Sequence, residues 1–506
     1  MNTTSRREFL GGVGRGVGYA ALGLALAERL GFAEALSRTM RDRLRFGALD
    51  PLVDLLQATP ADALLPLVVQ KLRGGTPLAD VVGAAALANA RAYGGTNYNG
   101  YHTLMAMMPS FEMAAQMPKP YGALPVLKVL HRNARFLQET GRAKEDALEP
   151  LAIAGRPADL VESVRARDLP QAEQSFAALE GQSAPQAYEK LQTVIRDDMN
   201  VHRVVLSWRA YDLLRLTGRD QEITMLRQSI RFCIDEDGRR AGRGEPANEI
   251  VKLLPNLMKE HGLETRKPGN RAMDAAKMER LTDTLFSADR AAAAGAAAAA
   301  LAEGFDPEDV GAAMSLAATR LLLNDPGLRQ EAPGKPVGSV HGASVGVHAS
   351  DSANAWRHIA RVGSAQNAFA SLIAGAYHTA GQSDHVDALP HDHDGEPCTK
   401  NDPAELLAEI EGRIRERDQK AACRAARRYC ELGHPHPELF ALLLGYAVSE
   451  DGALHAEKYF RTAQDEHSTA RAPHRALYLV ALTRVMASHF GFPAPGCDEA
   501  RKLLAS

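Results

Sequence analysis

The chain has 506 residues, of which 45% are hydrophobic and 24% charged, and this is the composition of an ordinary globular protein. Its formal net charge of −3 gives no electrostatic reason to expect nucleic acid or an anionic membrane surface as a partner. Histidine is abundant: the chain carries 17, and they concentrate in its last third.

Residues 1–35 are predicted to form a twin-arginine export signal. Ser5–Leu10 reads SRREFL, and a weakly apolar segment, Gly11–Ala27, follows it. Arg15 and several glycines make that segment too polar for a stable membrane span. Ala33–Ala35 then offers small residues at the spacing that a signal peptidase reads. We therefore expect export by the twin-arginine machinery, a periplasmic or otherwise exported location, and no stable membrane span in the mature protein.

Most of the remaining sequence has the apolar spacing of helices. Apolar residues recur at intervals of three and four, and β-branched alternation is scarce. The pattern predicts an all-α protein. The predicted helices, in chain order, are Asp80–Tyr93, Leu124–Glu139, Pro185–Asp198, Val201–Leu216, Asp220–Asp235, Asn270–Ala302, Pro307–Leu323, Ser350–Val362, Ala365–Ala380, Pro403–Leu432, Glu438–Ser449, Leu454–Glu466 and Pro473–Phe490. The predicted loops are Gly94–Gly100, Asn324–Gly346 and the histidine-rich Gly381–Pro403.

The two halves of the chain resemble each other. Leu72–Arg91 aligns with Leu301–Arg320 without a gap, and both segments share a pattern of Leu, Gly, Asp, Val, Ala and Arg. We predict two pseudo-symmetric helical repeats, residues 36–240 and 241–506, packed face to face around a central site. The second repeat contains the histidine-rich loop 381–403.

The matched positions include histidines. The sequence GYH that ends at His102 corresponds to GVH ending at His348, and His202 corresponds to His474. His102 and His348 each follow a glycine-containing loop, which allows close approach, and open a helix, which fixes the ring. A helical core does not need a histidine at one place twice, so we predict that this pair ligates a metal between the repeats. His202 and His474 are either ligands, residues that orient ligands, or hydrogen-bonded core histidines.

Three further residues extend the candidate site. His341 lies seven residues before His348 and has no counterpart in the first repeat, so it would add a ligand on one side only. His455 and Lys458 form an H-x-x-K pattern on one helix face. An ammonium group cannot ligate a metal. Lys458 is therefore an outward charge, a neutral amine, or a carbamate that offers an oxygen ligand.

Other histidines and methionines are weaker candidates. His378 lies late in a predicted helix, and His385, His391 and His393 are interpreted as members of a solvated loop. A methionine cluster after His102 raises the possibility of copper, but its helical spacing favours core packing. Its members are Met105, Met107, Met108, Met113 and Met117.

Three short motifs resemble questin-oxidase-like proteins. The segment HASDSANAWR, His348–Arg357, resembles that family's H-A-x-T-x-A-x-A-L-R stretch, with Asp351 where threonine is usual. His455–Lys458 is similar to its later H-x-x-K, and Gly100–Leu104 to its early N-H-x-x-x-A-L segment. The resemblance implies an all-helical, oxygen-using enzyme that acts on polycyclic or quinone-like substrates.

These observations together predict an exported, metal-dependent oxidoreductase or oxygenase with a small aromatic or quinone-like substrate and O₂. Imidazole ligands suit iron, copper, zinc and nickel, and the resemblance favours a mononuclear non-haem iron, with copper or zinc as alternatives. A non-catalytic periplasmic copper- or zinc-binding protein is the competing interpretation, and a helical interaction scaffold is a third. The expected metal-site residues are His102, His202, His341, His348, His455, Lys458 and His474.

Overall fold

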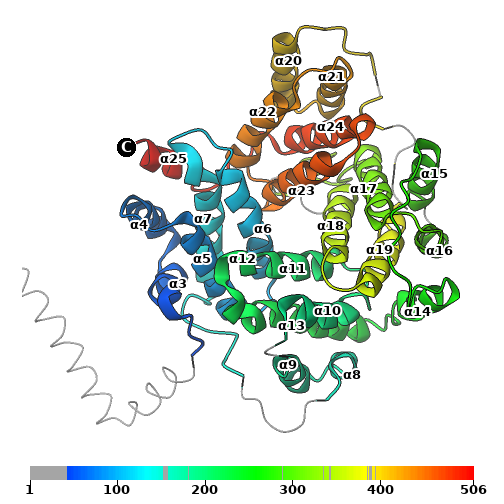
Figure 1. Cartoon of the computed structure of the whole chain (residues 1–506). Helices are drawn as coiled ribbons and strands as arrows, with labels where there is room; N and C mark the ends of the chain where they lie inside the picture. Colours follow the sequence, from blue (N-terminus) through cyan, green and yellow to red (C-terminus); the bar gives the residue numbers. More distant parts are fainter. Residues whose placement is uncertain are drawn as a thin grey trace, which may run out of the picture.

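The computed structural model is all-α, as the apolar spacing predicts (Figure 1). It describes residues 43–151, 158–179, 182–287, 289–333, 335–340, 344–383, 386, 390–393 and 395–506. The predicted export signal, His341 and His385 lie outside these residues. Within the described ranges, β-structure is limited to isolated bridges such as Arg271 with Phe305.

The first half of the chain forms short and medium helices. They are η1 (Gly47–Leu49), α3 (Asp50–Ala58), α4 (Ala61–Arg73), α5 (Leu78–Tyr93), α6 (Tyr98–Ala114), η2 (Tyr121–Ala123), α7 (Leu124–Glu139), α8 (Leu160–Arg165), α9 (Leu169–Ala177), α10 (Ala184–Ile195), α11 (Val201–Asp212), α12 (Leu214–Thr217), η3 (Arg219–Gln221) and α13 (Glu222–Gly242).

The second half is helical in the same way. Its helices are α14 (Ile250–Glu260), α15 (Ala275–Leu285), α16 (Arg290–Ala302), α17 (Pro307–Asn324), α18 (Val345–Ala360), α19 (Ala365–Ala380), α20 (Pro403–Glu416), α21 (Gln419–Glu431), α22 (His436–Ser449), α23 (His455–Thr469), α24 (Ala472–His489) and α25 (Cys497–Ala505).

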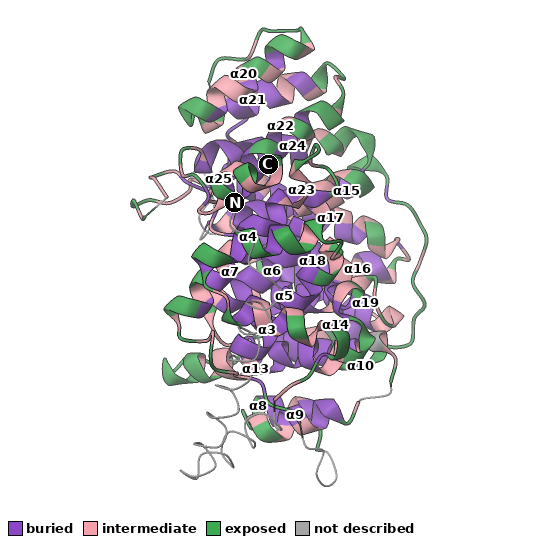
Figure 2. Cartoon of the chain, turned by 90° about the vertical axis from the view of Figure 1, so that its left-hand side faces the viewer, coloured by how far each residue is buried: buried purple, intermediate pink, exposed green. Residues whose placement is uncertain are grey.

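Four of these helices meet in a closed arrangement that joins the two halves. The first-half helices α6 and α11 pack on each other, and so do the second-half helices α18 and α23. Across the halves, α6 packs on α23 and α11 packs on α18. In Figure 2 the centre of the molecule is largely buried, whereas exposed residues lie toward the periphery. These four helices thus form the part of the interface between the predicted repeats that surrounds the site, while α25 packs on α4 and α7 elsewhere.

The segments matched in the sequence each belong to a pair of consecutive packed helices, α5–α6 and α17–α18. In each pair a glycine two residues before the matched histidine lies against the preceding helix. A Cβ on Gly100 would lie 2.4 Å from Cγ of Tyr93, and a Cβ on Gly346 would lie 2.3 Å from Cα of Leu322. Any larger residue would push the two helices apart. The matched glycines therefore set the position of the helix that carries each histidine.

The matched arginines form ion pairs with the second helix before each pair, α3 in the first half and α15 in the second. Buried Arg91 on α5 lies 2.7 Å from a carboxylate oxygen of Asp54 on α3. Arg320 on α17 lies 2.8 Å from Asp283 and 2.8 Å from Glu279 on α15. These contacts give both arginines a structural role.

Two described residues of the histidine-rich loop after α19, His391 and Asp392, are buried. His391 is buried, and its Nδ1 lies 3.1 Å from the carbonyl oxygen of Leu323. Asp392 beside it is buried and pairs with Arg427 on α21. The interpretation of this part of the loop as solvated is wrong, because a carbonyl and an arginine from packed helices satisfy its polar groups. His393 is exposed as expected.

The methionines after His102 belong to the core. Met105, Met107, Met108 and Met113 are at most 1% exposed and pack among other apolar side chains of the main core. This placement favours packing over copper ligation. In the described part of the chain, no helix has the length and apolar character needed to cross a membrane.

Candidate metal centre

Four of the predicted histidines come together where α6, α11, α18 and α23 meet. The centroids of the His102 and His202 rings are 4.7 Å apart, and those of His202 and His348 are 5.5 Å apart. His348 and His455 are separated by 5.4 Å, as are His455 and His102. Each ring thus contacts the next around a closed cycle, which we call the four-histidine cluster. It contains two residues from each half of the chain.

Each histidine lies in the first turn or so of its helix, where local contacts fix the backbone. The side chain of Asn97 accepts a hydrogen bond from the amide of Gly100 at the start of α6. At the start of α11, Asn200 accepts one from the amide of His202. At the start of α18, the hydroxyl oxygen of Ser344 accepts a hydrogen bond from the amide of Val347. These N-caps hold the chain at the point where each ring leaves it.

The start of α23 is built differently. Ala453 and Leu454 have φ angles of 50° and 66°, which are uncommon for residues with a side chain. This turn places the Ala453 carbonyl oxygen 2.9 Å from Nδ1 of His455, the first residue of the helix. The tight turn therefore orients the His455 ring directly.

The hydrogen bonds define which ring nitrogens face the cluster. Nδ1 of His102 lies 2.8 Å from the carbonyl oxygen of Tyr98, and Nδ1 of His455 bonds to a carbonyl in the same way. A carbonyl only accepts, so the neutral rings carry their protons on Nδ1 and leave the Nε2 lone pairs unprotonated. Nε2 of His102 and of His202 are buried without a hydrogen-bond partner. Buried orphan nitrogens are costly, and a metal ion is one group that would satisfy them.

The environment keeps these imidazoles neutral. Burial lowers the pKa of His102, His348 and His455 well below the ordinary value for histidine, and the charge of Lys458 adds to the effect. Burial and Lys458 lower the pKa of His202 to about 3. At neutral pH the four rings therefore keep the lone pairs that a metal requires.

One pair of ring nitrogens in the cluster has the spacing expected of two ligands on one metal ion. Two imidazole nitrogens that ligate one tetrahedral ion at about 2.0–2.1 Å lie about 3.3–3.4 Å from each other. Nε2 of His348 and Nε2 of His455 are 3.4 Å apart. Among the described residues, no group of three or more His, Cys, Asp or Glu side chains is already arranged to hold a metal ion. The His348–His455 pair thus has ligand spacing, and the other rings would have to turn inward to share an ion.

Lys458 is buried near the cluster and is not a surface cation. Its side chain is 2% exposed, and its charge acts on all four histidines. Burial lowers the pKa of Lys458 to about 8, while the carboxylates of Asp351 and Glu457 oppose that shift. Glu457 also pairs with buried Lys128 at 2.8 Å. Asp351, which follows His348 by three residues, accepts a hydrogen bond from Thr462 at 2.9 Å.

One predicted site residue, His474, lies away from the cluster. His474 lies at the start of α24, half-buried, where Glu279, Arg320 and Arg471 are the charged groups that act on it. Its correspondence with His202 in the sequence does not bring the two together, because α24 packs mainly on α21, α23 and α17 and not on α11. His341 lies outside the described residues.

Aromatic side chains cover the first-half side of the cluster. The Tyr98 ring centroid is 4.1 Å from that of His102, and the Tyr101 centroid is 5.3 Å from that of His202. Tyr101 is buried, whereas Tyr98 is 58% exposed. The cluster therefore approaches the molecular surface at Tyr98.

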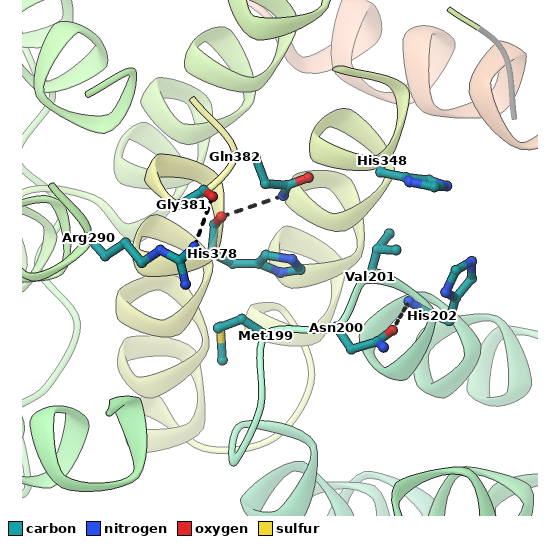
Figure 3. Close-up of a pocket in the computed structure, with 9 residues that line it drawn as sticks. All are labelled: Met199, Asn200, Val201, His202, Arg290, His348, His378, Gly381 and Gln382. Carbon is teal, nitrogen blue, oxygen red and sulfur yellow. Dashed lines mark hydrogen bonds between the residues drawn. The ribbon is translucent and has the colours of Figure 1, made fainter. Parts of the chain in front are cut away.

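A cavity of about 280 Å³ lies against the other side (Figure 3). His202 and His348 belong both to the cluster and to the cavity wall. The remaining described lining residues are Met199, Asn200, Val201, Arg290, His378, Gly381 and Gln382. The sequence motifs give no signal for Arg290 or Gln382, because these residues come from helix ends far apart in the chain. His378 was only a weak ligand candidate, and it lines the cavity.

Comparison with protein-family profiles, with curated proteins and with solved structures finds no significant match to this chain. The resemblance to questin-oxidase-like proteins therefore stays a prediction from three short motifs.

Proposed function

We propose that this protein is a metal-dependent oxidoreductase that uses O₂ to oxidise a small aromatic or quinone-like molecule. The observation that carries the proposal is the four-histidine cluster beside a cavity, in which the Nε2 atoms of His102 and His202 are buried without a hydrogen-bond partner. A structural cluster of histidines would be expected to satisfy its ring nitrogens with protein groups.

His102, His202, His348 and His455 are the residues that would hold the metal. All four are neutral imidazoles, which suit iron, copper, zinc and nickel, and the motif resemblance favours iron. Iron supplies the redox chemistry by which O₂ oxidises an electron-rich organic molecule. Carbonyl groups that bond to Nδ1 of His102 and His455 hold these rings in one orientation and raise their basicity as ligands.

The protein's own residues would bring a substrate to this centre. Because His202 and His348 line the cavity, a molecule bound there lies directly against the cluster. Buried Tyr101 on the opposite side limits the access of water to the rings. A bound substrate would therefore meet the metal in a partly dry environment, where electrostatic interactions are strong.

Export of the folded protein fits this proposal, because the twin-arginine pathway carries proteins that already hold a cofactor. The predicted signal in residues 1–35 supports loading of the metal before export.

Oxygen consumption tests the proposed activity. The full chain, stripped of metal and reloaded anaerobically with Fe(II), would be given hydroquinones, catechols and single-ring phenols in an oxygen electrode. We expect substrate-dependent consumption of O₂ that is lost in His348→Ala and retained in His474→Ala. Tight metal binding without any consumption would favour the non-catalytic copper- or zinc-binding protein, and failure to bind any metal would favour the scaffold.

A further inference from the structure

The cavity beside the four-histidine cluster has an uneven charge. Among its described lining residues there is one cation, Arg290, and no carboxylate. Asp198, the carboxylate that acts on the neighbouring His378, is itself paired with Arg240 at 2.5 Å. A cavity whose described lining carries a guanidinium and no carboxylate favours a negatively charged guest.

Arg290 reaches the cavity because Gly381 has no side chain. Arg290 is the first residue of α16, and its Nη2 donates a hydrogen bond to the carbonyl oxygen of Gly381 at 3.1 Å. A Cβ on Gly381 would lie 2.3 Å from Nε of Arg290. The backbone of Gly381 has φ −69°, so the conformation itself does not require glycine. Because Gly381 has no side chain, the guanidinium of Arg290 can lie against it at the cavity (Figure 3).

His378 offers a second donor. The indole Nε1 of Trp356 donates to Nδ1 of His378 at 3.2 Å. Because an indole N–H only donates, the neutral His378 ring carries its own proton on Nε2. Burial lowers the pKa of His378 to about 4, so the ring is neutral at pH 7. The cavity wall therefore combines a guanidinium and an imidazole N–H, and both donate to an acceptor.

The volume limits the size of the guest. A cavity of about 150 Å³ holds a benzene molecule, and drug-sized ligands occupy about 300–1,000 Å³. The cavity of about 280 Å³ fits one aromatic ring with a small substituent. The polycyclic molecule that the motif resemblance implies would extend beyond this volume.

We propose that this cavity binds a single-ring aromatic anion, a carboxylate or phenolate, with its charged oxygen at Arg290 and His378 and its ring toward His202 and His348. As a statement about the substrate, this inference rests on the proposed function. The anion contacts themselves need no metal.

Calorimetric titration of the full chain with benzoate and with its neutral analogue benzamide tests the proposal, in metal-loaded and metal-stripped protein. We expect benzoate to bind about tenfold more tightly than benzamide in both forms, because a charge-assisted contact is lost with the neutral ligand. Arg290→Gln should weaken benzoate about tenfold and leave benzamide unchanged. Gly381→Ala should weaken benzoate in the same direction, because its methyl group displaces the guanidinium without removing the charge.

Two controls separate this inference from the proposed function. Arg280→Gln removes an exposed charge from α15, away from the cavity, and should leave benzoate binding unchanged. The metal content of the Arg290 and Gly381 variants should equal that of the unaltered protein. Equal affinity for benzoate and benzamide, or benzoate binding that needs the metal and ignores Arg290, would overturn the inference and leave the oxidoreductase standing. Arg290-dependent benzoate binding in a protein that takes up no metal would support the anion cavity and overturn the proposed oxidoreductase.

Discussion

Nε2 of His348 and Nε2 of His455 lie 3.4 Å apart, although 107 residues separate them in the chain. The contact joins the first turns of α18 and α23, and the same first-turn placement recurs for His102 on α6 and His202 on α11. Four helix starts thus present one imidazole each to a common centre.

Lys458 is expected to contribute to metal binding as a neutral amine or as a carbamate. A free ammonium close to a divalent cation is repelled by several kcal/mol at short range. Lys458→Ala should therefore lower the metal content, and added acetate or formate should restore part of it by supplying the oxygen donor. Full occupancy in the alanine variant, measured by elemental analysis, would show that the lysine has no such role.

Gly346 is expected to control the position of His348. In Gly346→Ala the new methyl group would collide with the backbone of Leu322, which has no room to move. Overpacking of this kind costs about 1–3 kcal/mol, so the urea midpoint and the metal content should both fall. Gly295→Ala is the matched control, because a Cβ there meets nothing within 4 Å. That variant should be neutral or more stable by up to about 1 kcal/mol. Equal stability of the two variants would contradict the proposed close contact.

The α17–α18 pair should weaken at acid pH through Glu308. Arg361 bonds to both Glu308 carboxylate oxygens at 2.7 Å, and this interaction, with Arg357, lowers the pKa of Glu308 to about 2. A depressed carboxyl pKa stabilises the fold above the unfolded value and loses that effect as pH falls toward 2. Because the side chain is half exposed, we expect Glu308→Gln to cost less than about 1 kcal/mol at pH 7. The difference should vanish near pH 2 in unfolding curves, and a constant difference across pH would contradict this assignment.

Export should depend on Arg6 and Arg7. Replacement of both by lysine is expected to stop periplasmic accumulation of the protein, because the twin-arginine machinery reads the guanidinium pair. Cell fractionation measures the outcome. Undiminished accumulation of the double-lysine variant would remove the export prediction and leave the metal site untouched.

The histidines of the cluster could be predicted from the sequence, but the helix contacts and the cavity around them could not. His102 and His348 were predicted from their repetition and His455 from its H-x-x-K pattern. The structure brings these three together with His202, which was also a candidate. His474 was matched to His202 because spacing shows which residues share a helix face but not which helices meet. The contact between α6 and α23 depends on the packing of the whole chain, and so does the cavity.

The roles of Arg290 and His378 in the cavity could not be predicted for the same reason. Arg290 stands at the start of an alanine-rich helix, where its charge has no visible partner in the sequence. Its meeting with Gly381 depends on how α16 packs on α19. The tautomer of His378 likewise depends on Trp356, which is 22 residues away on another helix. Such relationships follow from tertiary contacts alone.

Metal analysis combined with X-ray absorption spectroscopy would show whether the four-histidine cluster holds a metal ion. The exported protein, purified without chelators, should contain about one metal ion per chain, with imidazole nitrogens at about 2.0–2.2 Å. His348→Ala and His455→Ala should lose that ion, whereas His474→Ala should retain it. Absence of any bound metal in the exported protein, or unchanged occupancy and spectra in His348→Ala, would contradict a metal site at the four-histidine cluster.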